Sequence, residues 1–178
     1  MKTLAKFERF ITKLNFLFFC CGAFFVFCLI VLMVTSVLAR YLFQISYAWF
    51  DELLWHTFGL SFLLASAYTL SQDGHVRVDI FYQKYSAKTK AWVEVGGIFF
   101  FMIPLCGILA FYGYFYATNS FQTGEISGSP NGLPYRWAIK SVIPFSFLLL
   151  LLQGFSHLIK QIIVLASPSK TYQVPNSK

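Results

Sequence analysis

Charged residues are scarce in this sequence. Only 12% of its 178 residues are Asp, Glu, Lys or Arg, whereas an ordinary soluble domain contains about 25%. Hydrophobic residues make up 57% of the chain and aromatic residues 20%. Intrinsic disorder is excluded because it requires low hydrophobicity and high charge, and few soluble folds could cover so apolar a chain with polar surface. The composition therefore indicates a membrane protein.

Long polar regions are lacking as well. Four stretches contain no charged residue: Leu14–Ala39, Leu53–Gln72, Val95–Gly124 and Ser141–Ile159. A helix needs about 20 residues to cross the hydrocarbon core, and the pieces between these stretches are below the roughly 40 residues at which small domains begin to fold alone. We expect an all-α integral membrane protein with four transmembrane helices, at about 14–39, 53–72, 95–118 and 141–159.

Basic residues are unevenly shared between the two sides of such a bundle. Of the 14 Lys and Arg, 11 fall in the N-terminal segment, the middle loop and the tail, and three fall in the two other loops. The positive-inside rule then predicts that both termini are cytoplasmic. The same residues predict contact with anionic lipid of the cytoplasmic leaflet. Binding of nucleic acid is disfavoured because no contiguous basic patch exists.

Two shorter segments show apolar residues at helical spacing. Residues 1–13 place Leu4, Phe7 and Ile11 between basic residues, which predicts a short amphipathic helix at the membrane interface. A similar pattern in the cytoplasmic middle loop predicts a second interfacial helix, or the first turns of the third span. We expect residues 1–165 to form one membrane domain and residues 166–178 to form a polar, disordered tail.

The second span is less apolar than the others. Ser61 and Ala65 stand four residues apart, the spacing of small residues that allows close helix packing. This span is therefore expected to contact protein rather than lipid. At its start, Asp51 and Glu52 fall in the first helical turn, where acidic side chains meet the positive end of the helix dipole. We expect them to cap the helix and to mark its boundary.

The sequence offers little for catalysis or cofactor binding. His56 is the ionisable residue expected inside a span, and with Asp51 and Glu52 it could bind a metal or move a proton. The trio lacks a nucleophile and a third clear ligand. Haem is disfavoured because His56 and His157 are expected at depths that differ by roughly 20 Å at about 1.5 Å per residue. We therefore expect no enzyme, no metal and no cofactor.

The residues at the ends of the spans resemble those of one family. The motif residues are Arg40, Trp49, Asp51, Glu52, Gly74, His75, Arg77, Asp79 and Pro134. Arg40 stands at the end of the first span, and the others fall in the runs Trp49–Glu52, Asp73–Asp79 and Gly132–Trp137. Together they resemble the small membrane subunit (Q-type) of tripartite ATP-independent periplasmic (TRAP) transporters over roughly residues 5–165.

The resemblance implies a function and partners. It implies a non-catalytic small permease subunit in a bacterial inner membrane, with a large multi-helix membrane subunit and a periplasmic substrate-binding protein as partners. Members of the family take part in sodium-driven uptake of organic acids such as C4-dicarboxylates or sialic acid. The small subunit is expected to bind no substrate, to stabilise the large subunit, and to border the surface where the binding protein docks. The motif residues are then candidates for contact with these partners.

Two other interpretations stay open on the sequence. The chain could be a stand-alone protein with four spans, such as a small channel or a lipid-interacting protein, or less plausibly a haem-binding membrane anchor. A stand-alone protein would be stable and active without a large partner. A haem protein would show a Soret band after purification.

Overall fold

The computed structural model describes residues 2–72 and 85–166, and within these ranges every regular element is helical. The elements are α1 (Lys2–Phe43), α2 (Ala48–Ser71), α4 (Ala87–Gly97), the π-helical segment η1 (Ile98–Met102), α5 (Ile103–Gln122) and α6 (Arg136–Ala166). Because α4, η1 and α5 follow one another directly, they act as one long helix. Within the described residues, four helices are long and apolar enough to cross a membrane. The predicted all-α membrane fold is thereby confirmed.

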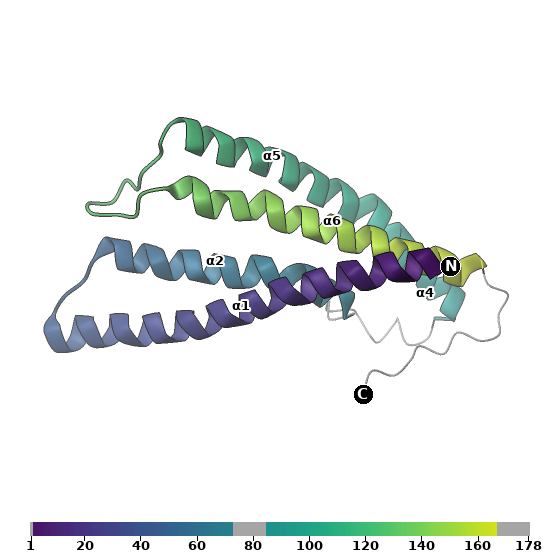
Figure 1. Ribbon diagram of the computed structural model, residues 1–178, viewed down its shortest axis with the longest axis horizontal. Helices are drawn as coiled ribbons and strands as arrows, with labels where there is room; N and C mark the ends of the chain where they lie inside the picture. Colours follow the sequence, from purple (N-terminus) through teal and green to yellow (C-terminus); the bar gives the residue numbers. More distant parts are fainter. Residues whose placement is uncertain (1, 73–84, 167–178) are drawn as a thin grey trace.

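The long helices form two hairpins, which Figure 1 shows side by side. α1 packs along α2 in the first hairpin, α5 packs along α6 in the second, and α2 contacts α6 where the two hairpins meet. The connections at residues 44–47 and 123–135 lie at one end of the bundle, which we call the turn end. Residue 2, the start of α4 and the end of α6 lie at the opposite end, which we call the terminal end.

The helices are longer than the stretches without charge. The spanning segments are Arg9–Phe43, Ala48–Ser71, Lys88–Gln122 and Arg136–Ile163, and each begins several residues before its predicted start. Basic residues at helix ends do not interrupt a span because their long apolar stems lie along the helix while the charge reaches water. Absence of charge therefore predicted the spans but not where the helices end.

The N-terminal segment differs from the expectation in one respect. Residues 2–13 are helical, but they continue without a break into the first span as part of α1. No Gly or Pro precedes Gly22 to interrupt the helix, and Ile11 and Asn15 are both buried in the bundle. The prediction that residues 1–13 form a separate interfacial helix is therefore wrong, because the described part of this segment belongs to α1. The second interfacial helix predicted in the middle loop lies partly in residues 73–84, outside the described residues, and that loop from Ala87 onward belongs to the start of α4.

Pro104 explains the π-helical segment. Proline lacks the backbone N–H of an ordinary helical turn, and its ring crowds the carbonyl four residues earlier. The chain widens into η1 immediately before this proline, and the Ile103 N–H donates to the Ile98 carbonyl, five residues back. A π turn of this kind lets a helix continue past a disruptive residue. The third span thus passes Pro104 without ending.

Glycines mark close backbone contacts between the helices of each hairpin. A Cβ atom at Gly22 of α1 would lie 2.9 Å from the Ser61 carbonyl oxygen and 3.4 Å from the Ala65 Cβ. The predicted small-residue face of α2 therefore packs against α1 and is not available to another protein at these positions. In the second hairpin, a Cβ at Gly113 would lie 3.2 Å from Pro144 Cδ. Small residues at these sites allow the helix backbones to approach.

The bundle has a polar and small-residue interior under an apolar exterior. The buried polar residues of the described chain are Asn15, Thr57, Ser61, Ser120, Lys140, Ser146, Gln153, Ser156 and His157. Large apolar side chains are instead strongly exposed, including Phe27 of α1, Phe62 of α2 and Phe101 of η1, at 63%, 66% and 76%. This distribution fits a bundle whose outer surface meets lipid or partner helices rather than water.

Candidate functional site

Glu52 joins the two hairpins at the turn end. One carboxylate oxygen accepts a hydrogen bond from the Ser127 hydroxyl, and the other accepts one from the Leu133 backbone N–H at 2.7 Å. Glu52 lies in the first turns of α2, whereas Ser127 and Leu133 belong to the connection between α5 and α6. Hydrogen bonds to an ionised carboxylate are stronger than neutral ones. We call Glu52, Ser127 and Leu133 the turn-end clamp.

The loop of the turn-end clamp is shaped to receive this carboxylate. The Ser127 N–H donates to the Leu133 carbonyl at 3.3 Å, and the Gly132 N–H donates to the Ser129 carbonyl at 3.0 Å. A side chain at Gly132 would collide with Ser127, because its Cβ would lie 2.3 Å from the Ser127 Cβ. Asn131 adopts a left-handed backbone with φ of 57°, which asparagine tolerates better than most residues. These residues fold the loop back over the start of α2.

Arg40 and Asp51 make a second contact at the turn end, within the first hairpin. The Arg40 guanidinium lies 3.4 Å from the Asp51 carboxylate, and both side chains are about half exposed. Asp51 lies in the first turn of α2, as expected, but the N-cap residue is Tyr47 and its side chain makes no capping hydrogen bond, so neither Asp51 nor Glu52 is the N-cap. Trp49 lies in the first turn and contacts the Tyr47 and Phe50 rings. The carboxylates bind other parts of the chain instead.

A third ionic group belongs to the second hairpin. The Lys140 ammonium donates to Glu125, and Arg136 lies 4.0 Å from the same carboxylate. Lys140 also lies over the Tyr116 ring, 3.9 Å from its centroid. The hydrogen bond from Lys140 holds the pKa of the Glu125 carboxyl below its usual value. Glu125 therefore stays ionised near neutral pH and ties the loop to α6.

Amide side chains join the two hairpins nearer the terminal end. The Asn15 side-chain N–H of α1 donates to the Gln153 side-chain oxygen of α6 at 2.8 Å, and both residues are 1% exposed. An unpaired amide in an apolar interior is costly, so such a pair favours one alignment of the two helices. Phe18 and Phe145 contact each other edge to face across the same helices, with ring centroids 5.0 Å apart.

A partly buried carboxylate and a buried imidazole also lie toward the terminal end. Glu94 of α4 lies 2.6 Å from the Nε2 atom of His157 in α6, and it accepts a hydrogen bond from Gln161. The expectation that His56 is the ionisable residue inside a span is wrong, because Glu94, Lys140 and His157 lie within spanning helices. The recurrence of Gln153, His157 and Gln161 at four-residue spacing on a leucine-rich helix was the sequence signal for this polar face.

The predicted motif residues have different positions in the structure. Arg40, Trp49, Asp51 and Glu52 gather at the turn end, and Pro134 lies exposed in the same region, directly after Leu133 of the turn-end clamp. The other motif residues fall outside the described residues: Gly74, His75, Arg77 and Asp79. Within residues 2–72 and 85–166, no group of three or more His, Cys, Asp or Glu is arranged to hold a metal.

The fold and these polar contacts define a multi-pass membrane protein. Two helical hairpins are held together by their own polar side chains, and the outer surface is left apolar. A family model described as "Tripartite ATP-independent periplasmic transporters, DctQ component" matches residues 29–163. The chain belongs to this family. No curated protein and no solved structure matches it.

Membership gives the function at a coarse level. The chain is the small permease component of a tripartite transporter, together with a second membrane component and a periplasmic binding protein. The family is a transporter component and not an enzyme. The predicted resemblance is thereby confirmed.

Proposed function

We propose that this chain is a static scaffold within its transporter. In this account the transporter is driven by sodium and takes up organic acids, while the small subunit stabilises the large membrane subunit and binds no substrate. The chain would lie in the bacterial inner membrane with both termini in the cytoplasm. The terminal end of the bundle is then cytoplasmic, and the turn end faces the periplasm.

The observation that carries this proposal is the closure of the bundle by its own contacts. The turn-end clamp and the Asn15–Gln153 bond fix the two hairpins at two separate heights. Glu94 and His157 bond each other and Gln161. A group that binds a coupling ion or a substrate in the membrane must instead be open to a pathway. A braced unit with an apolar outer surface suits a part that stays fixed while another subunit moves.

The turn end supports a further part of the proposal. The connections at residues 44–47 and 123–135 lie together there (Figure 1), and five motif residues lie at or near them. Several carry charge or accept hydrogen bonds at this surface, including Arg40 and Asp51. We infer that this end borders the docking surface of the periplasmic binding protein. Contacts of this kind affect association more than substrate choice.

Reconstitution into vesicles tests the proposal. Vesicles would contain the chain alone, the large subunit alone, or both, each with the binding protein and an inward sodium gradient. We expect accumulation of an organic acid only with both membrane components present. Accumulation by the lone chain would contradict the scaffold role and support the stand-alone channel. Full activity of the large subunit without this chain would also contradict it.

A further inference from the structure

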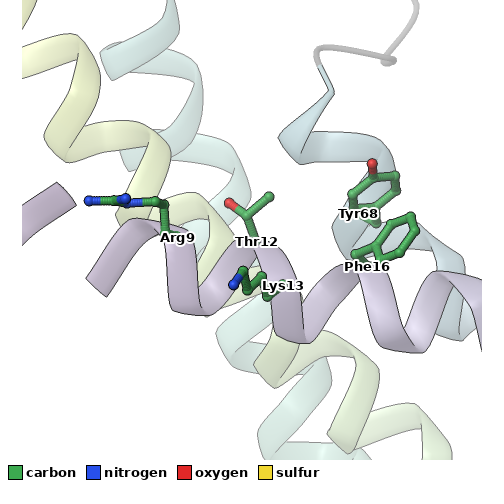
Figure 2. Close-up of a pocket in the computed structure, with 5 residues that line it drawn as sticks. All are labelled: Arg9, Thr12, Lys13, Phe16 and Tyr68. Atoms are coloured by element: carbon green, nitrogen blue, oxygen red, sulfur yellow. The ribbon is translucent and has the colours of Figure 1, made fainter. Parts of the chain in front are cut away.

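A basic groove with an aromatic wall lies between α1 and α2 toward the terminal end. Arg9, Thr12, Lys13 and Phe16 line it from α1, and Tyr68 lines it from α2. Figure 2 shows Phe16 beside the Tyr68 ring, with Thr12, Lys13 and Arg9 following toward the N-terminus. The four α1 residues recur at spacings of three and four, which places them on one face of the helix.

The aromatic part of the groove is formed by contacts between the two helices. The Tyr68 ring lies 5.4 Å from the Phe16 ring and 4.8 Å from the Phe19 ring, measured between centroids. Phe16 remains 49% exposed. An exposed aromatic surface inside the span can contact a lipid chain, and the tyrosine suits the boundary between apolar and polar layers.

The basic part of the groove supplies donors for an oxyanion. Arg9 and Lys13 are exposed, and Thr12 between them carries a hydroxyl. Arg9 already has an interaction within the chain, but a guanidinium carries five N–H donors and can bind a second group. Arg9 and Lys13 directly precede the charge-free stretch Leu14–Ala39, and basic residues that flank an apolar span lie at the depth of the phospholipid head groups.

We propose that this groove binds the phosphate of one anionic phospholipid, with an acyl chain along Phe16 and Tyr68. The order of the lining residues favours this occupant, because basic residues lie at the membrane boundary and aromatic residues follow toward the membrane centre. A free phosphate would use Arg9, Thr12 and Lys13 but gain nothing from the aromatic wall. The inference depends on the chain spanning a membrane and is independent of the scaffold role.

Native mass spectrometry of the purified full chain tests this site. Phosphatidylglycerol is titrated in, with phosphatidylcholine of the same acyl chains and inorganic phosphate as comparisons. We expect one phosphatidylglycerol per chain, bound more tightly than phosphatidylcholine. The double variant Arg9→Gln/Lys13→Gln should bind phosphatidylglycerol about 30-fold more weakly, since each basic residue near the surface contributes about 1 kcal/mol.

Matched variants distinguish a specific lipid-binding site from general electrostatic attraction between lipid and basic residues. Lys88→Gln/Lys90→Gln removes two charges near the start of α4, at the same end of the bundle, and should change binding less than about threefold. Tyr68→Leu should weaken lipid binding without affecting inorganic phosphate. Equal weakening in both double variants would overturn the proposal, and so would tight inorganic phosphate binding that depends on Arg9 and Lys13. Thermal unfolding checks that each variant is folded, and Lys13→Gln alone replaces the double variant if that variant is not.

Discussion

The close backbone contacts within each hairpin differ in kind from the two polar contacts that join the hairpins at opposite ends, although each hairpin also contains ion pairs of its own. Within the hairpins, glycines let the helix backbones approach, at Gly22 against Ser61 and at Gly113 against Pro144. Between the hairpins, directional polar bonds stand near opposite ends: Glu52 with the loop, and Asn15 with Gln153. Close packing therefore brings helices together, whereas polar pairs set how one hairpin aligns with the other.

This difference has a physical basis in the membrane. Lipid chains are as apolar as leucine, so burial of apolar surface does little to bring helices together, and close packing and hydrogen bonds must do so. Small residues allow a helix to approach the backbone of any neighbouring helix, so they do not specify which helices pack together. A carboxylate or an amide needs its own partner at hydrogen-bonding distance. The polar pairs thus supply the specificity that the apolar surfaces lack.

The largest expected effect comes from filling a contact within a hairpin. In Gly22→Val the new side chain would meet the Ser61 carbonyl, a backbone atom that cannot turn aside. We expect a loss of about 3 kcal/mol in the free energy of unfolding, measured in detergent. Gly107→Val is the matched control, because a Cβ at Gly107 meets nothing within 4 Å. Equal loss in both variants would contradict the assigned α1–α2 contact.

The next effect concerns the buried amide pair between the hairpins. Gln153→Leu removes the acceptor of the Asn15 N–H bond and leaves a buried donor unpaired, so we expect a loss of about 1 to 2 kcal/mol in unfolding free energy. Asn15→Leu/Gln153→Leu removes both polar groups and should be less destabilised than Gln153→Leu alone. If the separate losses of Asn15→Leu and Gln153→Leu add up to that of the double variant, the two side chains do not interact.

A smaller effect is expected at the turn-end clamp. Glu52→Gln removes the charge that receives the Leu133 N–H and the Ser127 hydroxyl. Hydrogen exchange of residues 127–133 should become about tenfold faster, since a hydrogen bond to a charged group is weakened. Uptake by the reconstituted transporter should fall without a change in substrate preference.

Asp51→Asn is the control for the turn-end clamp. It alters the neighbouring carboxylate, whose partner Arg40 lies within the same hairpin and is half exposed. An exposed pair of this kind contributes little, so exchange in residues 127–133 should remain as in the wild type. A changed substrate preference in Glu52→Gln would count against the view that this end only borders a docking surface.

The smallest effect is the pH dependence from Glu125. The hydrogen bond from Lys140 lowers the pKa of Glu125 in the folded chain, whereas an unperturbed Glu titrates at about 4.3. The stability that Glu125 adds is present above the unfolded value and is lost as the pH falls through the lower folded value. Thermal unfolding of wild type and Glu125→Gln should therefore differ near neutral pH and converge in acid. A constant difference down to pH values well below about 4 would contradict this assignment.

The sequence predicted the helices better than it predicted their contacts. Stretches without charge are long in this chain, so the four spans followed from composition, and Ser61 with Ala65 indicated a packed face. The partners of polar residues could not be predicted in the same way. Asn15 and Gln153 are 138 residues apart, and Glu52 and Leu133 are 81 apart. Such pairs depend on how the two hairpins meet, which no local pattern encodes.

Glu94 shows the same limit at a helix boundary. It stands one residue before a stretch without charge, so it was placed outside the span, whereas α4 begins at Ala87 and carries it beside His157. A charge inside a helix is tolerated when a partner helix provides a buried hydrogen-bonding group. That partner is visible only after α4 and α6 are packed.

A cross-link between the hairpins tests the scaffold role most directly. Gly59 of α2 faces Ile139 of α6, with 4.0 Å between a Cβ built at Gly59 and the Ile139 Cδ1 atom. A short thiol-specific linker would join Gly59→Cys and Ile139→Cys after the four native cysteines are replaced by serine or alanine. If the chain is a static scaffold, the locked subunit supports uptake at the rate of the unlocked one. Uptake that stops on locking and returns on release would show that the hairpins move during transport, and would contradict the account.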